Sequence, residues 1–112
     1  DRKKDVIITG GENVSSIEVE DRLFSHPAVA EVAVIGVPDE TWGEVVKAVV
    51  GLKPEASATE QELIDHCREH LAHFKCPRSV DFVDELPRLP TGKLYKRLLR
   101  DRYWQGHSSA IV

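Results

Sequence analysis

Two long apolar runs constrain what this chain can fold into more than any other feature of its sequence. Residues 29–37 are apolar apart from Glu31 and Gly36, and residues 45–52 form a second run of the same kind that carries Lys47. Their length and their many β-branched residues favour strands covered on both faces rather than surface strands. The sequence therefore predicts a small sheet with other elements packed above and below it.

Capping patterns outside these runs predict helices. A Ser-x-x-Glu box at residues 15–18 opens a helix that runs to about residue 25. A second box at residues 59–62 opens an amphipathic helix whose apolar stripe continues through Phe74. A last helix is expected from about residue 94 to residue 103.

A third strand and a hairpin complete the expected fold. Val80, Phe82 and Val83 predict the short strand, and two β-prone segments joined by glycines predict a hairpin over residues 6–14. The expected class is α+β, with a small three-stranded sheet, helices packed on it and a short β-hairpin before it.

Composition narrows the function classes. The 112 residues carry a net charge of −4, which argues against a generic nucleic-acid binder, although basic residues crowd the last helix. A nucleic-acid module using that helix, and a scaffolding domain without catalysis, therefore stay as alternative hypotheses.

No apolar run approaches the ~18 residues of a membrane span and no signal peptide is visible. The two cysteines lack a metal or redox spacing, which is consistent with a reducing cytoplasm. The absence of an initial methionine suggests a piece cut from a longer polypeptide.

A proline-rich stretch at residues 86–97 predicts an exposed loop with a lysine at its most mobile point. Pro87 and Pro90 exclude a continuous helix or central strand, and Gly92 frees the backbone just before Lys93. A lysine ammonium placed this way can reach a neighbouring site and favour a phosphate. The stretch is not a Walker loop, because the required glycine and hydroxyl residues are missing. A plain surface lysine is the alternative.

Three further features each have a structural and a functional interpretation. The Gly10-Gly11 pair fits a tight turn, or a backbone against which a ligand lies. Trp42 fits packing over the sheet, or the lining of a ligand channel. His66 and His70 lie one helical turn apart with His73 nearby, but nothing in the spacing completes a metal site.

Three segments together resemble the carboxy-terminal domain of the acyl-adenylate-forming enzymes, especially acyl-CoA synthetases. They are Asp1-Arg2-x-Lys4-Asp5 with Gly10-Gly11-Glu12-Asn13-Val14 and Glu18-Val19-Glu20, then Gly43-Glu44 with Ala48-Val49-Val50, and finally Leu86-Pro87-Arg88-x-Pro90-Thr91-Gly92-Lys93. Each motif alone is weak, but their order and spacing are specific, and the resemblance extends to about Arg102. It makes Lys93 a candidate catalytic residue.

The resemblance implies an activity in two half-reactions. Such enzymes join a carboxylic acid to ATP, with Mg²⁺, and then transfer the acyl group from the adenylate to coenzyme A. Their large amino-terminal domain holds most of the ATP and acid site, and the small domain is a lid with two orientations. In the first, Lys93 would reach the acid and the α-phosphate, supported by Thr91 and Gly92, while Arg2 matches an arginine that contacts the nucleotide.

In the second orientation the hairpin would face the site. Gly10, Gly11 and Glu12 would then line the tunnel for the pantetheine arm of coenzyme A, and Asp1 matches the hinge position. The implied domains are residues 1–14 for hinge and hairpin, 15–104 for the lid, and 105–112 for a disordered tail.

The versions of these motifs look most like fatty or aryl acyl-CoA ligases. Members of the family often have proline where this chain has Ser16, and glycine or tyrosine where it has Glu12. Neither difference argues against the resemblance. The resemblance implies no transmembrane segment and no nucleic-acid partner. The isolated piece is expected to turn over nothing, because it lacks the nucleotide pocket.

Overall fold

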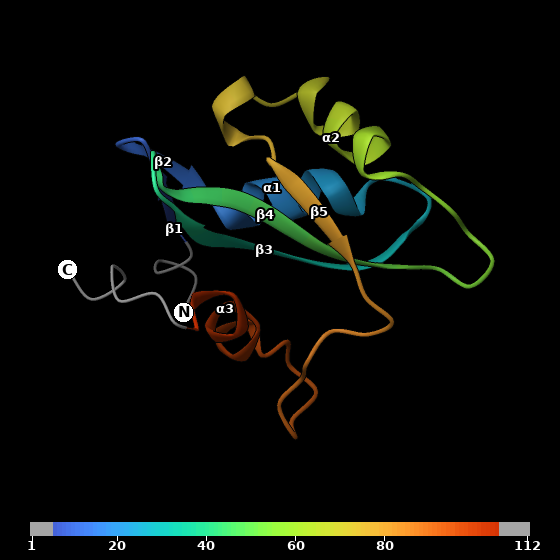
Figure 1. The fold of residues 1–112 in the computed structure, drawn as a ribbon. Coiled ribbons are helices and arrows are strands. Elements are labelled where there is room, and N and C mark those ends of the chain that lie inside the picture. The colour runs from blue at the N-terminus through green and yellow to red at the C-terminus, as the bar shows by residue number, and fades with distance from the viewer. Residues whose placement is uncertain (1–5, 106–112) are drawn as a thin grey trace.

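A mixed five-stranded sheet organises the fold (Figure 1). The computed structural model describes residues 6–105. Its elements in chain order are β1 (Val6–Thr9), β2 (Glu12–Ser15), α1 (Ser16–Phe24), β3 (Val29–Asp39), β4 (Gly43–Leu52), α2 (Glu60–Arg68), a short 3-10 helix (His73–Lys75), β5 (Ser79–Phe82) and α3 (Lys96–Trp104).

The two apolar runs form the central antiparallel pair, as predicted. β3 and β4 pair along nearly their whole length, from Val29 opposite Leu52 to Asp39 opposite Gly43. β5 lies parallel to β4, pairing from Lys47 opposite Ser79 to Val50 opposite Phe82.

Helices cover both faces of this pair (Figure 1). α1 and α2 lie on one face and α3 lies on the other, so the side chains of each strand alternate between two cores. Val34 and Val46 pack with Leu23 and Leu63 of the two upper helices. The second core is formed by Ala33, Ile35, Val37, Val45, Val49, Leu86 and Leu99. The strands are therefore buried on both faces, which explains why their sequence is continuously apolar.

The hairpin is continuous with the sheet. β1 and β2 pair antiparallel around the Gly10-Gly11 turn, and Thr9 also pairs with Gly43 at the start of β4. The expected three-stranded sheet and its preceding hairpin thus form one sheet, because the end of β1 reaches the free edge of β4 before β5 begins.

The second and third helices differ in extent from the prediction. α2 ends at Arg68, and at Ala72 the backbone has left the helical conformation, with a ψ of 147°. Phe74 consequently lies in the 3-10 helix and is 41% exposed instead of continuing the buried stripe. α3 begins at Lys96, not at residue 94, since Leu94 is held in a β-bridge with Arg88.

Several predictions concern residues outside this range. Asp1, Arg2 and residues 106–112 of the expected tail lie outside the described residues. Between residues 6 and 105, every helix is too short or too polar to cross a membrane.

Candidate functional site

The loop that carries Lys93 is a narrow, hydrogen-bonded hairpin rather than a slack segment. The Leu89 amide donates to the Lys93 carbonyl at 2.7 Å, and the Gly92 amide donates to the Leu89 carbonyl at 2.8 Å. At its base the Tyr95 amide donates to the Pro87 carbonyl at 2.8 Å. Backbone hydrogen bonds therefore define the shape of this loop from its base to its tip.

Gly92 is required at this tip by its backbone conformation. Its φ of +94° is disfavoured for any residue with a side chain, whereas a Cβ there would meet no atom within 4 Å. Thr91, Gly92 and Lys93 are all exposed. Within residues 6–105 the Lys93 ammonium has neither an ion-pair nor a hydrogen-bond partner, which leaves its charge available for a ligand.

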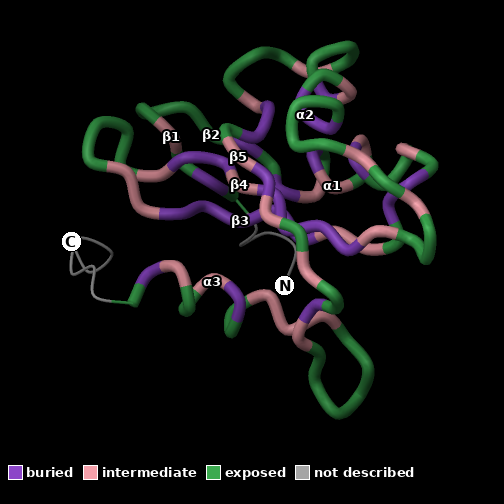
Figure 2. Tube along the Cα trace, turned by 45° about the vertical axis from the view of Figure 1, so that its right-hand side comes forward, coloured by how far each residue is buried: buried purple, intermediate pink, exposed green. Residues whose placement is uncertain are grey.

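The loop is anchored through its first residue. Leu86 is buried in the core between the sheet and α3, while the exposed tip projects below that core (Figures 1 and 2). Buried apolar side chains resist displacement, because exposing one costs about 1.5–3 kcal/mol. The lysine thus stands at the end of a short arm fixed to the core.

The Gly10-Gly11 turn combines a packing role with an open backbone. Both glycines have positive φ, +58° and +87°. A Cβ on Gly10 would overlap the ring of Trp42, whose carbonyl accepts the Gly10 amide at 3.0 Å. At Gly11 a Cβ would meet nothing within 4 Å, so its backbone is bare to solvent. Glu12 follows and is also exposed.

Trp42 packs on this turn, at the hairpin end of the sheet. The Asp39 carboxylate accepts the amides of Thr41 and Trp42 at 3.0 and 2.8 Å, which fixes the loop that carries the ring. The ring is still 43% exposed, and the Arg78 guanidinium lies 5.4 Å from its centroid. Arg78 was not identified from the sequence, because it is far from Trp42 along the chain and belongs to no motif.

The lysine loop and the glycine turn do not meet. Figures 1 and 2 show the hairpin at one end of the sheet and the Lys93 loop below the sheet, next to the start of α3. One face of the domain therefore cannot present both features to a single site. Asp1 and Arg2, the other candidates, lie outside the described residues.

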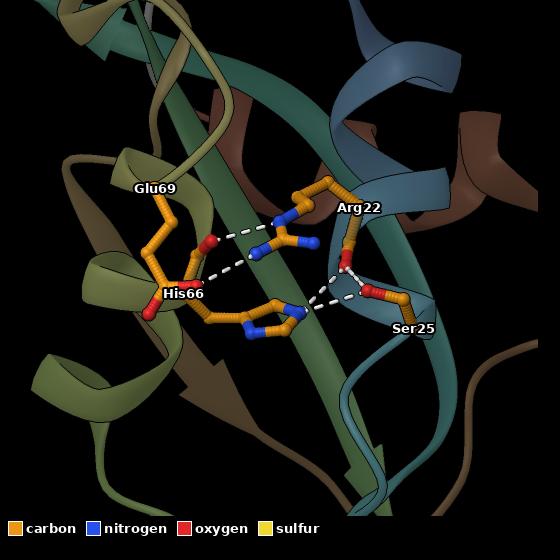
Figure 3. Close-up of polar contacts among 4 residues, drawn as sticks. All are labelled: Arg22, Ser25, His66 and Glu69. Atoms are coloured by element: carbon orange, nitrogen blue, oxygen red, sulfur yellow. Dashed lines mark hydrogen bonds and ion pairs between the residues drawn. The ribbon is translucent and has the colours of Figure 1, made fainter.

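His66 belongs to the joint between two helices (Figure 3). Its Nε2 lies 2.8 Å from the Ser25 hydroxyl and 3.1 Å from the Arg22 carbonyl, while the Arg22 Nε donates to the His66 carbonyl at 2.8 Å. Burial lowers the pKa of His66, as do the nearby charges of Arg22 and His26. The described part of the chain contains no group of three or more His, Cys, Asp or Glu that could hold a metal ion.

Several of the α3 residues that a nucleic-acid module would use are engaged in the fold, although Arg97 and Arg102 are exposed. Trp104 is buried and its indole donates to the Gly36 carbonyl at 2.7 Å. Lys96 pairs with Glu20 at 2.6 Å, and the Arg100 guanidinium stacks 4.4 Å from the Trp104 ring centroid. These contacts make α3 a structural element of the sheet's lower face.

Tyr103 fixes α3 to the sheet through a carboxylate. Its hydroxyl donates to Asp81 at 2.5 Å, and Lys47 also donates to Asp81 at 2.9 Å. Burial raises the pKa of Tyr103 to about 12, and its hydrogen bond to Asp81 adds to this shift. Burial alone would raise the pKa of Asp81, but the bonds from Tyr103 and Lys47 outweigh it and lower that pKa.

We expect Tyr103→Phe to lower stability by about 1 kcal/mol at pH 8, the scale of one hydrogen bond. The folded state raises the pKa of Tyr103, so the contribution of this residue is complete below pH ~10 and falls as pH approaches ~12. The parent should therefore lose more stability than the variant between these values. Urea midpoints from pH 8 to pH ~11.5 measure this. Tyr95→Phe is the control, and equal slopes for parent and Tyr103→Phe would contradict the assignment.

Fold and site together define a small α+β domain that carries a hydrogen-bonded lysine loop and a glycine turn on separate sides. Among known proteins, the family model described as AMP-binding enzyme C-terminal domain matches residues 18–93. The chain belongs to this family.

Three similar proteins extend this result. "Probable CoA ligase CCL11" of Humulus lupulus is 55% identical over 103 residues, covering 90% of this chain and 18% of that protein. The solved "Mycobacterium tuberculosis fatty acyl CoA synthetase" has a TM-score of 0.85 at 47% identity, covering 92% of this chain and 20% of that one. ATP-bound MatB from Rhodopseudomonas palustris has a TM-score of 0.87 at 43% identity, with the same coverage. The chain thus spans about a fifth of the length of these proteins.

Proposed function

We propose that this chain is the mobile C-terminal lid of an ATP-dependent, AMP-forming acyl-CoA ligase, which activates a carboxylic acid, by preference a fatty acid, as an acyl-adenylate and transfers it to coenzyme A. Its nearest partner would be the N-terminal AMP-binding domain of the same polypeptide. Family membership and the names of the similar CoA ligases support this proposal.

The Lys93 ammonium, unpaired among the described residues, is the main observation that supports the first half-reaction. Its ammonium has no partner in the described part of the chain, and its loop is closed by backbone hydrogen bonds. In adenylate formation, a carboxylate oxygen attacks the α-phosphorus of ATP and pyrophosphate leaves. A positioned cation offsets the repulsion between the two anions and the charge gathered on the phosphoryl oxygens. Thr91 and Gly92 would hold the turn from which Lys93 reaches the site.

The glycine turn would serve the second half-reaction. There the thiolate sulfur of coenzyme A attacks the acyl carbonyl, the acyl–phosphate bond breaks and AMP leaves. Gly11 and Glu12 offer an exposed backbone edge beside the Trp42 ring, against which a narrow pantetheine arm could lie. We include Trp42 in this surface because its ring is held against Gly10.

The separation of the two features supports a lid that rotates. Lys93 and the glycine turn lie on different sides of the domain, so each half-reaction needs its own orientation against the N-terminal domain (Figure 1). Asp1 remains our proposal for the hinge and Arg2 for a nucleotide contact, and both rest on the sequence motif alone.

Mg²⁺ would be bound outside this domain. The described residues offer no cluster of carboxylates, imidazoles or thiols that suits a metal, so the ion would be held by the ATP phosphates and the N-terminal domain. ATP and coenzyme A would likewise bind mainly there. For the compartment we propose the cytoplasm, because both cysteines within the described range are free thiols.

The acid is the open part of the proposal, and an aryl-CoA ligase or another adenylating enzyme is the alternative. The test uses the full polypeptide that carries this domain, with ATP, Mg²⁺ and a panel of fatty and aryl acids, with and without coenzyme A. We expect acid-dependent pyrophosphate release that yields AMP, and an acyl-CoA when coenzyme A is present. A folded, ATP-binding enzyme that releases no pyrophosphate with any acid would contradict the proposal.

A further inference from the structure

We propose that Arg88 and Glu31 are positioning residues for Lys93, forming a bridge that transmits the rigidity of the central sheet to the tip of the lysine loop. This inference rests on the proposed role of Lys93 in adenylate formation. Arg88 and Glu31 would not touch the substrate. They would act only by fixing the peptide from which Lys93 extends.

Arg88 joins the sheet to the peptide that enters Lys93. One guanidinium nitrogen, Nη2, donates to Glu31 Oε1 at 2.5 Å, and the other, Nη1, donates to the Gly92 carbonyl at 3.0 Å. That carbonyl and the Lys93 amide belong to one planar peptide unit. The Arg88 contact therefore sets the orientation of the bond from which the Lys93 side chain departs.

Glu31 holds both ends of this arrangement. Its second oxygen, Oε2, accepts the amide of Leu86 at 3.0 Å, so one carboxylate fixes the base of the loop while it orients Arg88. Leu86 itself is buried. The carboxylate side chain is 20% exposed and the Arg88 side chain 46% exposed. The Arg88 end of this ion pair is nearly half exposed, so the attraction of its charge to Glu31 contributes little to stability by itself.

A β-bulge places Glu31 on the side of the sheet that faces the loop. The register of β3 shifts between Val29 and Glu31, which marks a β-bulge. Val29 packs in the core between the sheet and the helices α1 and α2, whereas Ala33 and Ile35 pack in the core between the sheet and α3. Because side chains alternate along a strand, residue 31 would share the face of Val29 without this shift. The bulge moves Glu31 to the face of α3 and the lysine loop.

Gly51 of β4 leaves room for the Glu31 side chain. It pairs directly opposite Glu31, and a Cβ at Gly51 would lie 3.0 Å from Glu31 Cγ and 3.3 Å from its Oε2. A larger residue would push the carboxylate away from Leu86 and Arg88. The bulge and Gly51 thus allow the Glu31 carboxylate to bind both the Leu86 amide and Arg88. Arg88 in turn binds the Gly92 carbonyl.

The test separates the two half-reactions in the full polypeptide. Pyrophosphate release with acid and ATP reports adenylate formation, and acyl-CoA formation from a supplied acyl-adenylate reports thioester formation. A misplacement of about 1 Å can cost on the order of 100-fold in rate, so we expect Arg88→Ala and Glu31→Gln to slow adenylation roughly 10- to 100-fold. Thioester formation should stay close to the parent value in both variants. The melting temperature should stay close to the parent value for Arg88→Ala and fall modestly for Glu31→Gln, which has one acceptor oxygen in place of two for the Leu86 amide and Arg88. Arg88→Lys, which cannot span both acceptors with a planar fork, should fall between parent and Arg88→Ala.

The Lys93→Ala background distinguishes positioning from any independent role. If Arg88 acts only through Lys93, adding Arg88→Ala to Lys93→Ala should lower the residual adenylation rate no further. Glu69→Gln is the matched control, because it removes the Arg22–Glu69 ion pair of 3.1 Å between α1 and α2, away from the loop. It should leave both half-reactions unchanged.

Each contrary outcome has a distinct meaning. Arg88 and Glu31 variants that adenylate like the parent, while Lys93→Ala is crippled, would overturn the positioning inference and leave the proposed function standing. Losses that multiply fully with Lys93→Ala, or that affect both half-reactions equally, would also overturn it. Unimpaired adenylation by Lys93→Ala itself would instead refute the proposed role of Lys93.

Discussion

Replacing Lys93 with alanine is expected to slow acyl-adenylate formation by roughly 100- to 1,000-fold, the usual effect of removing one preorganised charge-stabilising group. The loss should be this large because no other cation in the described loop has an uncommitted charge at the tip, since Arg88 is paired with Glu31. Thioester formation from a supplied acyl-adenylate should be nearly unchanged. The measurement compares pyrophosphate release with acyl-CoA production from the adenylate in the full polypeptide.

Two further variants sharpen this experiment. Lys53→Ala removes an exposed lysine elsewhere on the surface and should change neither half-reaction. Lys93→Arg keeps the charge but moves it, so its adenylation rate separates the need for a cation from the need for its position. Equal losses in both half-reactions for Lys93→Ala would rule out a lid with two separate orientations.

The opposite pattern is expected for Gly10→Ala, which should impair thioester formation roughly 10- to 100-fold and adenylation far less. The added Cβ would overlap the Trp42 ring at a residue whose φ is +58°, so the turn must shift or the ring must move. Overpacking and a left-handed backbone each cost on the order of 1–3 kcal/mol, and we expect a lower melting temperature as well.

Gly43→Ala is the matched control for backbone strain. Gly43 also has a positive φ, +82°, but a Cβ there would meet nothing within 4 Å. It should therefore lose stability from strain alone and retain more thioester formation than Gly10→Ala. If the two variants lose thioester formation equally, the contact between Gly10 and Trp42 does not shape the proposed coenzyme A surface. Thermal melts and thioester assays on the same preparations decide this.

Local signals in the sequence were sufficient for most of the fold. The apolar runs became the buried pair β3 and β4, because continuous apolarity over a strand's length is stable only between two packed layers. At the second capping box, Thr59 and Glu62 exchange the expected hydrogen bonds. At the first, the Ser15 hydroxyl accepts the Glu18 amide at 3.3 Å. Such contacts span three residues, so a sequence pattern contains all the partners.

The features that the sequence did not predict depend on contacts between residues far apart in the chain. The predicted helix through Phe74 was too long, because the chain must turn back to lay β5 beside β4, and helix periodicity carries no sign of that requirement. For Trp42 the sequence offered packing on the sheet or the lining of a channel, and it did not indicate the contact with Gly10, about thirty residues away in the chain.

The amino-acid sequence by itself determined the class of fold and the family, and it provided Lys93 as the candidate for the proposed chemistry, since each depends on residue type and local spacing. Only the tertiary structure decided how that lysine is held. Glu31 and Arg88 are separated by 57 residues, and a β-bulge and a glycine bring them together. No local pattern encodes such a contact, because its geometry arises from the pairing of strands and the return of the chain across the sheet.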